Sequence, residues 1–412
     1  MEAAKPVEAA KPAPAASSPS RAKGANLRIL LWQSYKYEGI ATYAKEFEDL
    51  TGAKLTFDPV ADAELPSKQI VTLSGKTGEY DLTTVDEPYM PAYSSFLSEL
   101  DPYVQGDKFP KEDWVPVMWD AGVFNGKTYA VAFDPNVQIF IYRKDVFEQK
   151  GIKVPTKFSE AYEAAKKIQG DQMAGWVMMA IRNAQTGINA WTFLTTWGNE
   201  IFDDKFQPAF DNDKGYQALE FYKKAIDTVM PKGVLGMDYA AMNAEYRQGK
   251  AGFMQQWASI APGIKTSKDS VVADKTGYAA ALGEEKRHSM RGVWSWGLPA
   301  DGKQRDAAWE FVKWFTTPES MMKYVKSGAG NSPRLAVLDS PEFQKSFDHA
   351  PALAETFKIA KKRPIFKEYN EILDALNIMG SKVCTGEASP KDAIKEASGK
   401  LSEVMKRGGY LK

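Results

Sequence analysis

The stretch TYAVAFDPNVQIFIYR, residues 128–143, decides the architecture that the sequence predicts. Its β-branched and aromatic residues are typical of an extended strand. Asp134-Pro135 lies in its middle, and a proline cannot donate a hydrogen bond to a neighbouring strand. A long strand interrupted in this way is typical of a segment that leaves one folded body and enters another. We therefore predict that the chain crosses between two bodies near residues 130–137.

The chain before this stretch alternates strand and helix patterns. LRILLW, residues 27–32, is a short apolar run that predicts a buried strand, and the segment 40–52 has apolar residues on one helix face before a terminal glycine. KLTFDPV, residues 54–60, predicts a second strand, and residues 66–86 predict a helix, a glycine turn and a third strand that ends at Asp86. This alternation is typical of a parallel α/β sheet. Asn125-Gly126 predicts a hairpin turn.

The chain after this stretch is rich in helix patterns. The helical segments that we predict are residues 155–168, 189–200, 214–230, 306–325 and 388–409, the last with Ser389-Pro390 as its cap and first turn. GKAGFMQQ, residues 249–256, predicts a strand that ends near Trp257.

GVWSWGLP, residues 292–299, carries two tryptophans one residue apart. On a strand, Trp294 and Trp296 would share one face. Such a pair can form part of a core, or it can form a platform on which a ligand stacks. The flanking Gly292 and Gly297 would allow close approach of other groups.

Composition excludes several classes of function. The 412 residues carry 53 Lys+Arg and 53 Asp+Glu, so the net charge of zero gives no electrostatic footprint for nucleic acid. One cysteine, Cys384, and two histidines, His288 and His349, are too few for a zinc site or a histidine-based catalytic triad. We expect no cofactor and no metal. No apolar run of the chain is long enough to span a membrane.

The first 25 residues are rich in Ala, Pro, Ser and Lys and contain no aromatic residue. This composition predicts a disordered leader or tether outside the fold. We expect the native signal region to be absent from this chain, and any association with a membrane to be peripheral at most, through a lipid anchor on this leader.

Three apparent catalytic or binding motifs fail on inspection. SGKTG, residues 74–78, resembles the end of a phosphate-binding loop, but Ile70 stands where that motif needs a glycine. FDNDKG, residues 210–215, resembles a calcium loop without the final acidic ligand, so a capped helix start is the better interpretation. Any two of the 53 carboxylates could be imagined as a glycosidase pair, and the sequence spacing selects none.

The order of these segments resembles the family 1 extracellular solute-binding proteins of ABC importers, the group that binds maltodextrins, glycerol phosphate and polyols. The matching blocks run from about residue 27 to 410 and include residues 79–104, 246–262, 291–319 and 331–343. The WSW pair and the DEPYMPAY block, residues 86–93, look most like the polyol and small-sugar branch.

The resemblance implies an α/β fold of two lobes, the type II periplasmic-binding-protein fold, with a ligand cleft at the lobe interface. We predict an N-terminal lobe of residues 26–133 and 296–333 and a C-terminal lobe of residues 134–295 and 334–412. Further crossings are expected near 292–297 and 331–335.

The cleft residues are expected at strand ends, because loops after the carboxyl ends of parallel strands supply ligand-binding groups. After the first predicted strand, residues 27–32, the candidates are Trp32, Gln33 and Ser34. After the third, which ends at Asp86, they are Asp86 and Glu87. Asp86 is the favoured acceptor for ligand hydroxyls, and its alternative role is a helix cap before Pro88.

Five further candidates lie near the predicted crossings or strand ends. Asn136 could reach the cleft or form a turn of its own. Trp257 and Trp294 could stack on a ligand or lie in a core, and Trp296 would support Trp294. Arg334 could bind hydroxyls or an anionic group, or form a salt bridge between the lobes.

We therefore predict a monomeric, non-enzymatic binding protein that captures a sugar or polyol by hinge closure and delivers it to ABC permease subunits outside the cytoplasm. Two alternatives stay open, a carbohydrate-active enzyme with two carboxylates and a solute sensor that serves a receptor. An anionic sugar derivative bound by Arg334 is the alternative ligand.

Overall fold

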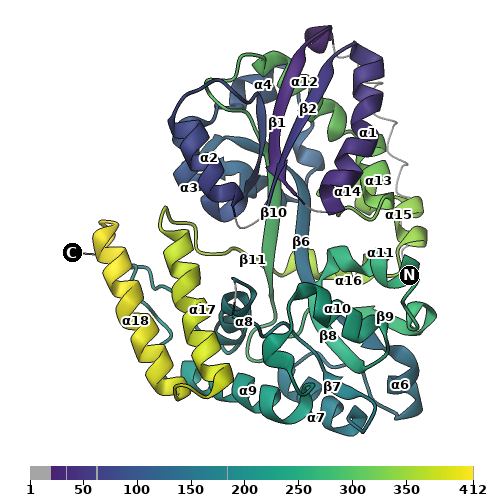
Figure 1. Cartoon of the computed structure of the whole chain (residues 1–412), viewed down its shortest axis with the longest axis vertical. Helices are drawn as coiled ribbons and strands as arrows, with labels where there is room; N and C mark the ends of the chain where they lie inside the picture. Colours follow the sequence, from purple (N-terminus) through teal and green to yellow (C-terminus); the bar gives the residue numbers. More distant parts are fainter. Residues whose placement is uncertain (1–19, 34, 62–63, 183, 412) are drawn as a thin grey trace, which may run out of the picture.

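The computed structural model describes residues 20–33, 35–61, 64–182 and 184–411. Figure 1 shows two bodies, one above the other, joined by long strands that run through both. We call the upper one, which contains the amino-terminal strands, the first body, and the lower one the second body.

The first body is built on the predicted alternation of strands and helices. Strands β1 (Asn26–Trp32), β2 (Lys54–Val60) and β3 (Leu82–Asp86) are separated by helices α1 (Tyr35–Thr51) and α2 (Leu65–Ser74). β1 pairs in parallel with both β2 and β3, which confirms the prediction of a parallel α/β sheet. Because β3 runs parallel to β1, the carboxyl ends of both strands reach the same edge of the sheet, where Trp32 and Asp86 lie.

The two long strands β6 (Ala130–Arg143) and β10 (Ser289–Gly297) carry the sheet from one body to the other. The sheet order is β2-β1-β3-β10-β6-β8-β7, so β10 pairs with β3 on one side and β6 on the other. The register between β10 and β6 shifts after Trp294, next to Asp134 and Pro135. A bulge at this point lets a proline stay within a continuous strand, because local pairing is already irregular.

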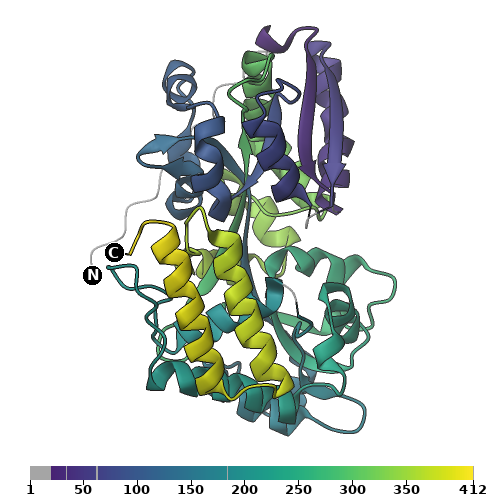
Figure 2. The same cartoon turned by 60° about the vertical axis from the view of Figure 1, so that its left-hand side comes forward.

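The second body combines the far end of the sheet with a helical layer. Its strands are β7 (Ala174–Trp176), β8 (Ala251–Trp257) and β9 (Thr276–Ala279). Figure 2 shows α17 and α18 side by side on one flank of this body. Its helices are α6 (Lys144–Gln149), α7 (Phe158–Ile168), α8 (Ala184–Thr196), α9 (Asp213–Val229), α10 (Tyr239–Arg247), α17 (Tyr369–Thr385) and α18 (Pro390–Arg407).

The remaining elements are short or connect the two bodies. They are α3 (Met90–Tyr93), α4 (Asp101–Gly106), α5 (Pro116–Trp119), β4 (Val123–Phe124), β5 (Lys127–Thr128), α11 (Ala261–Thr266), α12 (Arg305–Phe315), α13 (Pro318–Lys326), α14 (Leu335–Leu338), α15 (Pro341–Ser346), α16 (Ala350–Lys358) and β11 (Ala360–Lys361), together with short 3-10 helices. The hairpin predicted at Asn125-Gly126 joins β4 and β5, and both turn residues have positive φ.

One local boundary differs from the sequence patterns, and two predicted helix caps agree with them. The helical stretch 306–325 is divided between α12 and α13, because Thr317 accepts a hydrogen bond from the Ser320 amide and Pro318 occupies the first position of a new helix. Both predicted cap motifs are confirmed: Ser389 accepts from the Asp392 amide at the start of α18, and Asn212 accepts from the Gly215 amide at the start of α9.

The segment 20–25, which we assigned to the leader, packs against the first body. Ala22 is fully buried, and the Arg21 guanidinium contacts the carboxylates of Asp107 and Glu310. The composition of this segment resembles the preceding residues, so the composition alone gave no signal of these tertiary contacts. Residues 1–19 lie outside the described residues.

His288 directly precedes β10 and is buried in the second body. Its burial predicts that the stability of the fold depends on pH. Its Nε2 lies 2.9 Å from the Thr195 hydroxyl, and burial, with a smaller contribution from Lys361, lowers its pKa to about 4. In the unfolded chain the pKa is about 6.5, so the unfolded state binds more protons between these values. Stability therefore falls as the pH drops through this window.

Lowering the pH from 7 to 5.5 is expected to remove about 1 kcal/mol of stability through His288 alone. Chemical unfolding at both pH values measures this loss. A His288→Gln variant should lose less stability over the same interval than the parent chain. An identical loss in the variant would show that protonation of His288 is not linked to unfolding.

Candidate functional site

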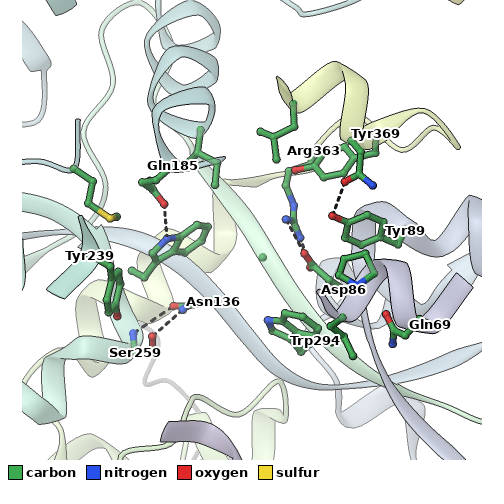
Figure 3. A pocket seen from close by; sticks show the side chains of 18 of the residues that line it. Gln69, Asp86, Tyr89, Asn136, Gln185, Tyr239, Ser259, Trp294, Arg363 and Tyr369 are labelled. Carbon is green, nitrogen blue, oxygen red and sulfur yellow. Dashed lines mark hydrogen bonds and ion pairs between the residues drawn. The ribbon is translucent and has the colours of Figure 1, made fainter. Parts of the chain in front are cut away.

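A cleft of about 830 Å³ lies between the two bodies, beside the crossing strands. Figure 3 shows side chains from both bodies converging on it. The described residues that line it are Leu65, Pro66, Ser67, Gln69, Asp86, Tyr89, Asn136, Met179, Gln185, Ile188, Tyr239, Trp257, Ser259, Gly292, Trp294, Arg363, Tyr369, Asn370 and Leu373. Of the ten residues predicted to bind a ligand, four are in this set: Asp86, Asn136, Trp257 and Trp294.

Trp294 presents the flat surface of its indole ring in the wall of the cleft. Its ring is stacked on the buried ring of Trp32, with centroids 4.3 Å apart and planes within 4° of parallel. The stack fixes the orientation of Trp294, which lies on β10 opposite Asp86 of β3. An aromatic plane held beside a carboxylate suits a solute that has both C–H faces and hydroxyl groups.

Trp257 supplies a second indole from the end of β8. Its Nε1 donates to the Gln185 side-chain carbonyl over 3.3 Å, which ties it to α8. Gly292 of β10 lies next to the Trp257 ring, and a Cβ at this glycine would be 3.4 Å from the nearest ring atom. The glycine therefore lets the indole lie close to the crossing strand.

Asn136 and Ser259 form a polar group on the second-body side of the cleft. The Asn136 amide nitrogen donates to the Ser259 hydroxyl over 2.9 Å, and its carbonyl oxygen accepts from the backbone amides of Val137 and Ser259. These contacts hold the Asn136 side chain in one orientation. It presents amide and hydroxyl groups without a net charge.

Asp86 and Arg363 form a bidentate ion pair across the cleft (Figure 3). Nη1 of Arg363 donates to Oδ2 of Asp86 over 3.0 Å, and Nη2 donates to Oδ1. The side chains are 15% and 8% exposed, respectively. Burial disfavours the charged guanidinium, but the Asp86 carboxylate outweighs this effect and the pKa of Arg363 is raised. Asp86 makes no side-chain cap contact with the helix that follows it.

Tyr89 makes a second contact between the bodies near this ion pair. Its hydroxyl donates to the Asn370 side-chain carbonyl over 2.8 Å, and its ring meets the edge of Tyr369 with centroids 5.6 Å apart. Asn370 and Tyr369 belong to the first turn of α17. Residues 363–370 thus face the end of β3 and the turn after it.

The structure does not bring five of the predicted residues to the cleft wall. Trp32 lies beneath Trp294, and Gln33 is exposed beyond the end of β1. Trp296 is fully buried in the first body, where its ring stacks on Phe133 at 4.5 Å. Trp294 and Trp296 therefore have different surroundings, because β10 leaves the cleft and enters the core within two residues. Ser34 lies outside the described residues.

Glu87 and Arg334 are instead engaged in buried ion pairs. Glu87 is 1% exposed and accepts from Nε of Arg291 over 2.9 Å. Arg334 donates to the Thr316 carbonyl over 2.7 Å and pairs with the Asp113 carboxylate, and its guanidinium lies 4.8 Å from the Trp114 ring centroid. These contacts occupy both side chains away from the cleft, so the predicted ligand roles of Glu87 and Arg334 have no support in this structure.

Several lining residues were not predicted. Arg363 follows Lys361 and Lys362 in a basic run, which is usually a solvated surface segment. Tyr89 lies in the DEPYMPAY block that carried the family resemblance, but its pairing partner is 281 residues away in the sequence. Gln185 and Tyr239 have no local sequence signal that separates them from other polar residues.

The described cleft residues are suited to binding rather than to bond breaking. Two indoles, the Asn136–Ser259 pair and one compensated ion pair surround the space, and the lining set contains no histidine or cysteine. In the described part of the chain, no group of three or more His, Cys, Asp or Glu residues could hold a metal ion. No helix in the described ranges is long and apolar enough to cross a membrane.

The chain belongs to the bacterial extracellular solute-binding protein family, whose model matches residues 32–322. The fold is the two-lobed α/β fold of periplasmic binding proteins, as the resemblance implied, and the protein is a non-enzymatic solute-binding component of an ABC transporter. The carbohydrate-enzyme alternative is therefore set aside.

Relatives of this chain have been named for different solutes. A mannitol-binding protein of Pseudomonas aeruginosa is 27% identical over 81% of this chain and 82% of its own length. A probable amino-acid ABC transporter periplasmic-binding protein of Sinorhizobium fredii is 25% identical over 97% of this chain and 93% of its own length.

A solved relative has a closely similar fold. The crystal structure of an ABC transporter solute-binding protein of Agrobacterium radiobacter, in complex with ribitol, is 27% identical and has a TM-score of 0.86. The similarity covers 93% of this chain and 99% of that chain.

Proposed function

We propose that the protein captures an uncharged sugar or polyol in the cleft between its two bodies and delivers it to the permease subunits of an ABC importer. The observation that supports this most is the stacked Trp294 beside the paired Asp86 carboxylate. The indole offers a plane for C–H faces, and the carboxylate is a charged acceptor for hydroxyl groups. The names of the mannitol-binding and ribitol-bound relatives agree with this solute class.

The proposed mechanism is closure of the two lobes about the crossing strands. In it, Trp294 and Asp86 receive the solute from the first body, and Trp257 and Asn136 contact it from the second. The solute shifts the open–closed equilibrium only by its greater affinity for the closed state. This proposal includes the lobe boundaries predicted from the sequence, and it places the hinge at the three predicted crossings near residues 130–137, 292–297 and 331–335.

The proposed setting is outside the cytoplasm, as a monomer that meets the permease with one lobe on each half. The leader would tether the protein to the membrane surface if it carries a lipid anchor. A role as a sensor would use the same cleft with a receptor in place of the permease. Measuring uptake of the bound solute by cells that lack this protein decides between transport and sensing. Uptake should be lost if the protein serves transport and should persist if it serves only as a sensor.

An amino acid is the competing solute, because it is named for one relative and because the cleft holds one carboxylate and one guanidinium. These two groups are already paired with each other, so an amino acid would have to separate them. This favours an uncharged solute.

Thermal unfolding with a panel of polyols, sugars and amino acids tests the proposal. A solute present at 100 times its Kd adds about 2.7 kcal/mol of stability, which raises Tm by a few degrees. We expect such a rise with at least one polyol or sugar. A rise with amino acids alone would contradict the proposed solute class.

A further inference from the structure

The Asp86–Arg363 pair contains the only charged side chains among the described residues that line the cleft. All other described lining residues are apolar, aromatic, amide or hydroxyl residues, or glycine. The formal charges of the pair cancel, so this part of the cleft wall is neutral as a whole. The inference below rests on the proposed function and concerns which members of that solute class can bind.

The pair is held rigidly from both sides. Asp86 ends β3 and lies opposite Trp294 in the register with β10, so its backbone belongs to the sheet. The Arg363 guanidinium lies 5.8 Å from the ring centroid of Tyr369, which is itself only 4% exposed. The two charges therefore face each other in a poorly hydrated place, where a third charge is not screened effectively.

A neutral hydroxyl can use the pair without breaking it. A carboxylate has about four acceptor positions, and Arg363 occupies two of them. The guanidinium has five N–H donors, and Asp86 accepts from two of its nitrogens. A solute hydroxyl can thus donate to Asp86, or accept from Arg363, while the ion pair stays intact.

A charged group at the same position meets one favourable and one unfavourable partner. A solute carboxylate attracted by Arg363 comes within reach of the Asp86 carboxylate, and a solute ammonium attracted by Asp86 comes within reach of Arg363. The attraction is cancelled by the repulsion, whereas the desolvation cost of the solute charge remains. Selection against charged solutes then follows from repulsion as well as from contacts to the correct solute.

We propose that the Asp86–Arg363 pair makes the cleft selective for uncharged solutes, and that each half, left alone, admits the solute of opposite charge. In this proposal both residues determine specificity. Asp86 excludes sugar acids and Arg363 excludes amino polyols.

Three solutes of equal length test the proposal by calorimetric titration. For a chain that binds mannitol they are D-mannitol, D-mannonate and 1-amino-1-deoxy-D-mannitol, and for one that binds ribitol they are the corresponding ribitol derivatives. In the parent protein we expect the neutral polyol to bind at least tenfold more tightly than either charged analogue.

Asp86→Asn keeps the size of the side chain and removes its charge, and Arg363→Gln removes the charge, keeps an amide donor and shortens the side chain. Asp86→Asn should raise the affinity for the sugar acid relative to the neutral polyol by at least tenfold. Arg363→Gln should raise the affinity for the amino polyol relative to the neutral polyol by at least tenfold. The double variant is the matched control, because its neutral pair should favour neither charged analogue. Circular dichroism and Tm establish that each variant is folded.

Each outcome supports or overturns the proposal. Opposite shifts in the two single variants support it. Three results would overturn it: equal binding of the three solutes by the parent protein, unchanged affinity ratios between the solutes in folded single variants, or complete loss of binding in both single variants. In each case the ion pair would only hold the two bodies together. If the parent protein binds neither polyols nor sugars, the proposed function itself fails, and the inference fails with it.

Discussion

Replacing Trp294 with alanine is expected to weaken binding of the solute by about 30- to 100-fold. Central aromatic residues in desolvated sites contribute 2 kcal/mol or more when truncated, and each 1.4 kcal/mol corresponds to a tenfold change in Kd. Trp294 meets this description because Trp32 holds its ring in one plane beside Asp86. Trp294→Phe keeps a smaller plane and should lose less than tenfold. Calorimetric titration measures both.

Trp119 provides the matched control for this substitution. It is partly buried in the first body against Phe109 and Trp114, and it does not line the cleft. Trp119→Ala should lower Tm without changing Kd. If Trp294→Ala binds as tightly as the parent protein, the solute does not stack on this indole, and the centre of the proposed site is elsewhere.

Removing one partner of the Glu87–Arg291 pair is expected to cost about 3–5 kcal/mol of stability, because the other charge is left buried without a counterion. Both side chains are about 1% exposed or less, and Nε of Arg291 donates to both Glu87 oxygens over 2.9 Å. Arg291 also donates to the Val117 carbonyl. Chemical unfolding of Glu87→Gln and Arg291→Met at pH 7 measures the loss.

The double variant Glu87→Leu with Arg291→Met distinguishes the cost of one unpaired buried charge from the contribution of the ion pair itself. Replacing both charges with apolar groups of similar size is often nearly neutral, so this variant should recover most of the stability lost in either single variant. Single variants within 1 kcal/mol of the parent chain would contradict the account, since they would show that water or another group compensates the remaining charge.

Much of the fold could be predicted because its signals are local. The strand predicted at residues 54–60 is β2, and the capped helix predicted from Ser389-Pro390 is α18. The alternation before Asp86 predicted parallel pairing, which β1, β2 and β3 confirm. The division of residues 306–325 into two helices was less evident, although Thr317 and Pro318 carry the signal in the sequence.

The candidate site could be predicted where a residue ends a strand that reaches the cleft or lies on a strand that crosses between the bodies. Asp86 and Trp257 end β3 and β8, whereas Asn136 and Trp294 lie within the crossing strands β6 and β10. Arg363 joins the site through a partner 277 residues away, and nothing in its own segment distinguishes it from the lysines before it. Glu87 follows Asp86 directly in the sequence, but its side chain is buried and pairs with Arg291 instead of lining the cleft. Which of the two carboxylates faces the cleft depends on tertiary packing.

The most direct test of the central claim is a titration of intrinsic tryptophan fluorescence with a panel of polyols, sugars and amino acids. Trp257 and Trp294 line the cleft, so a bound solute changes the surroundings of both indoles. The account predicts a saturable change with at least one polyol or sugar, and a much smaller response in Trp294→Phe. A saturable response to amino acids, with none to any polyol or sugar, would contradict it.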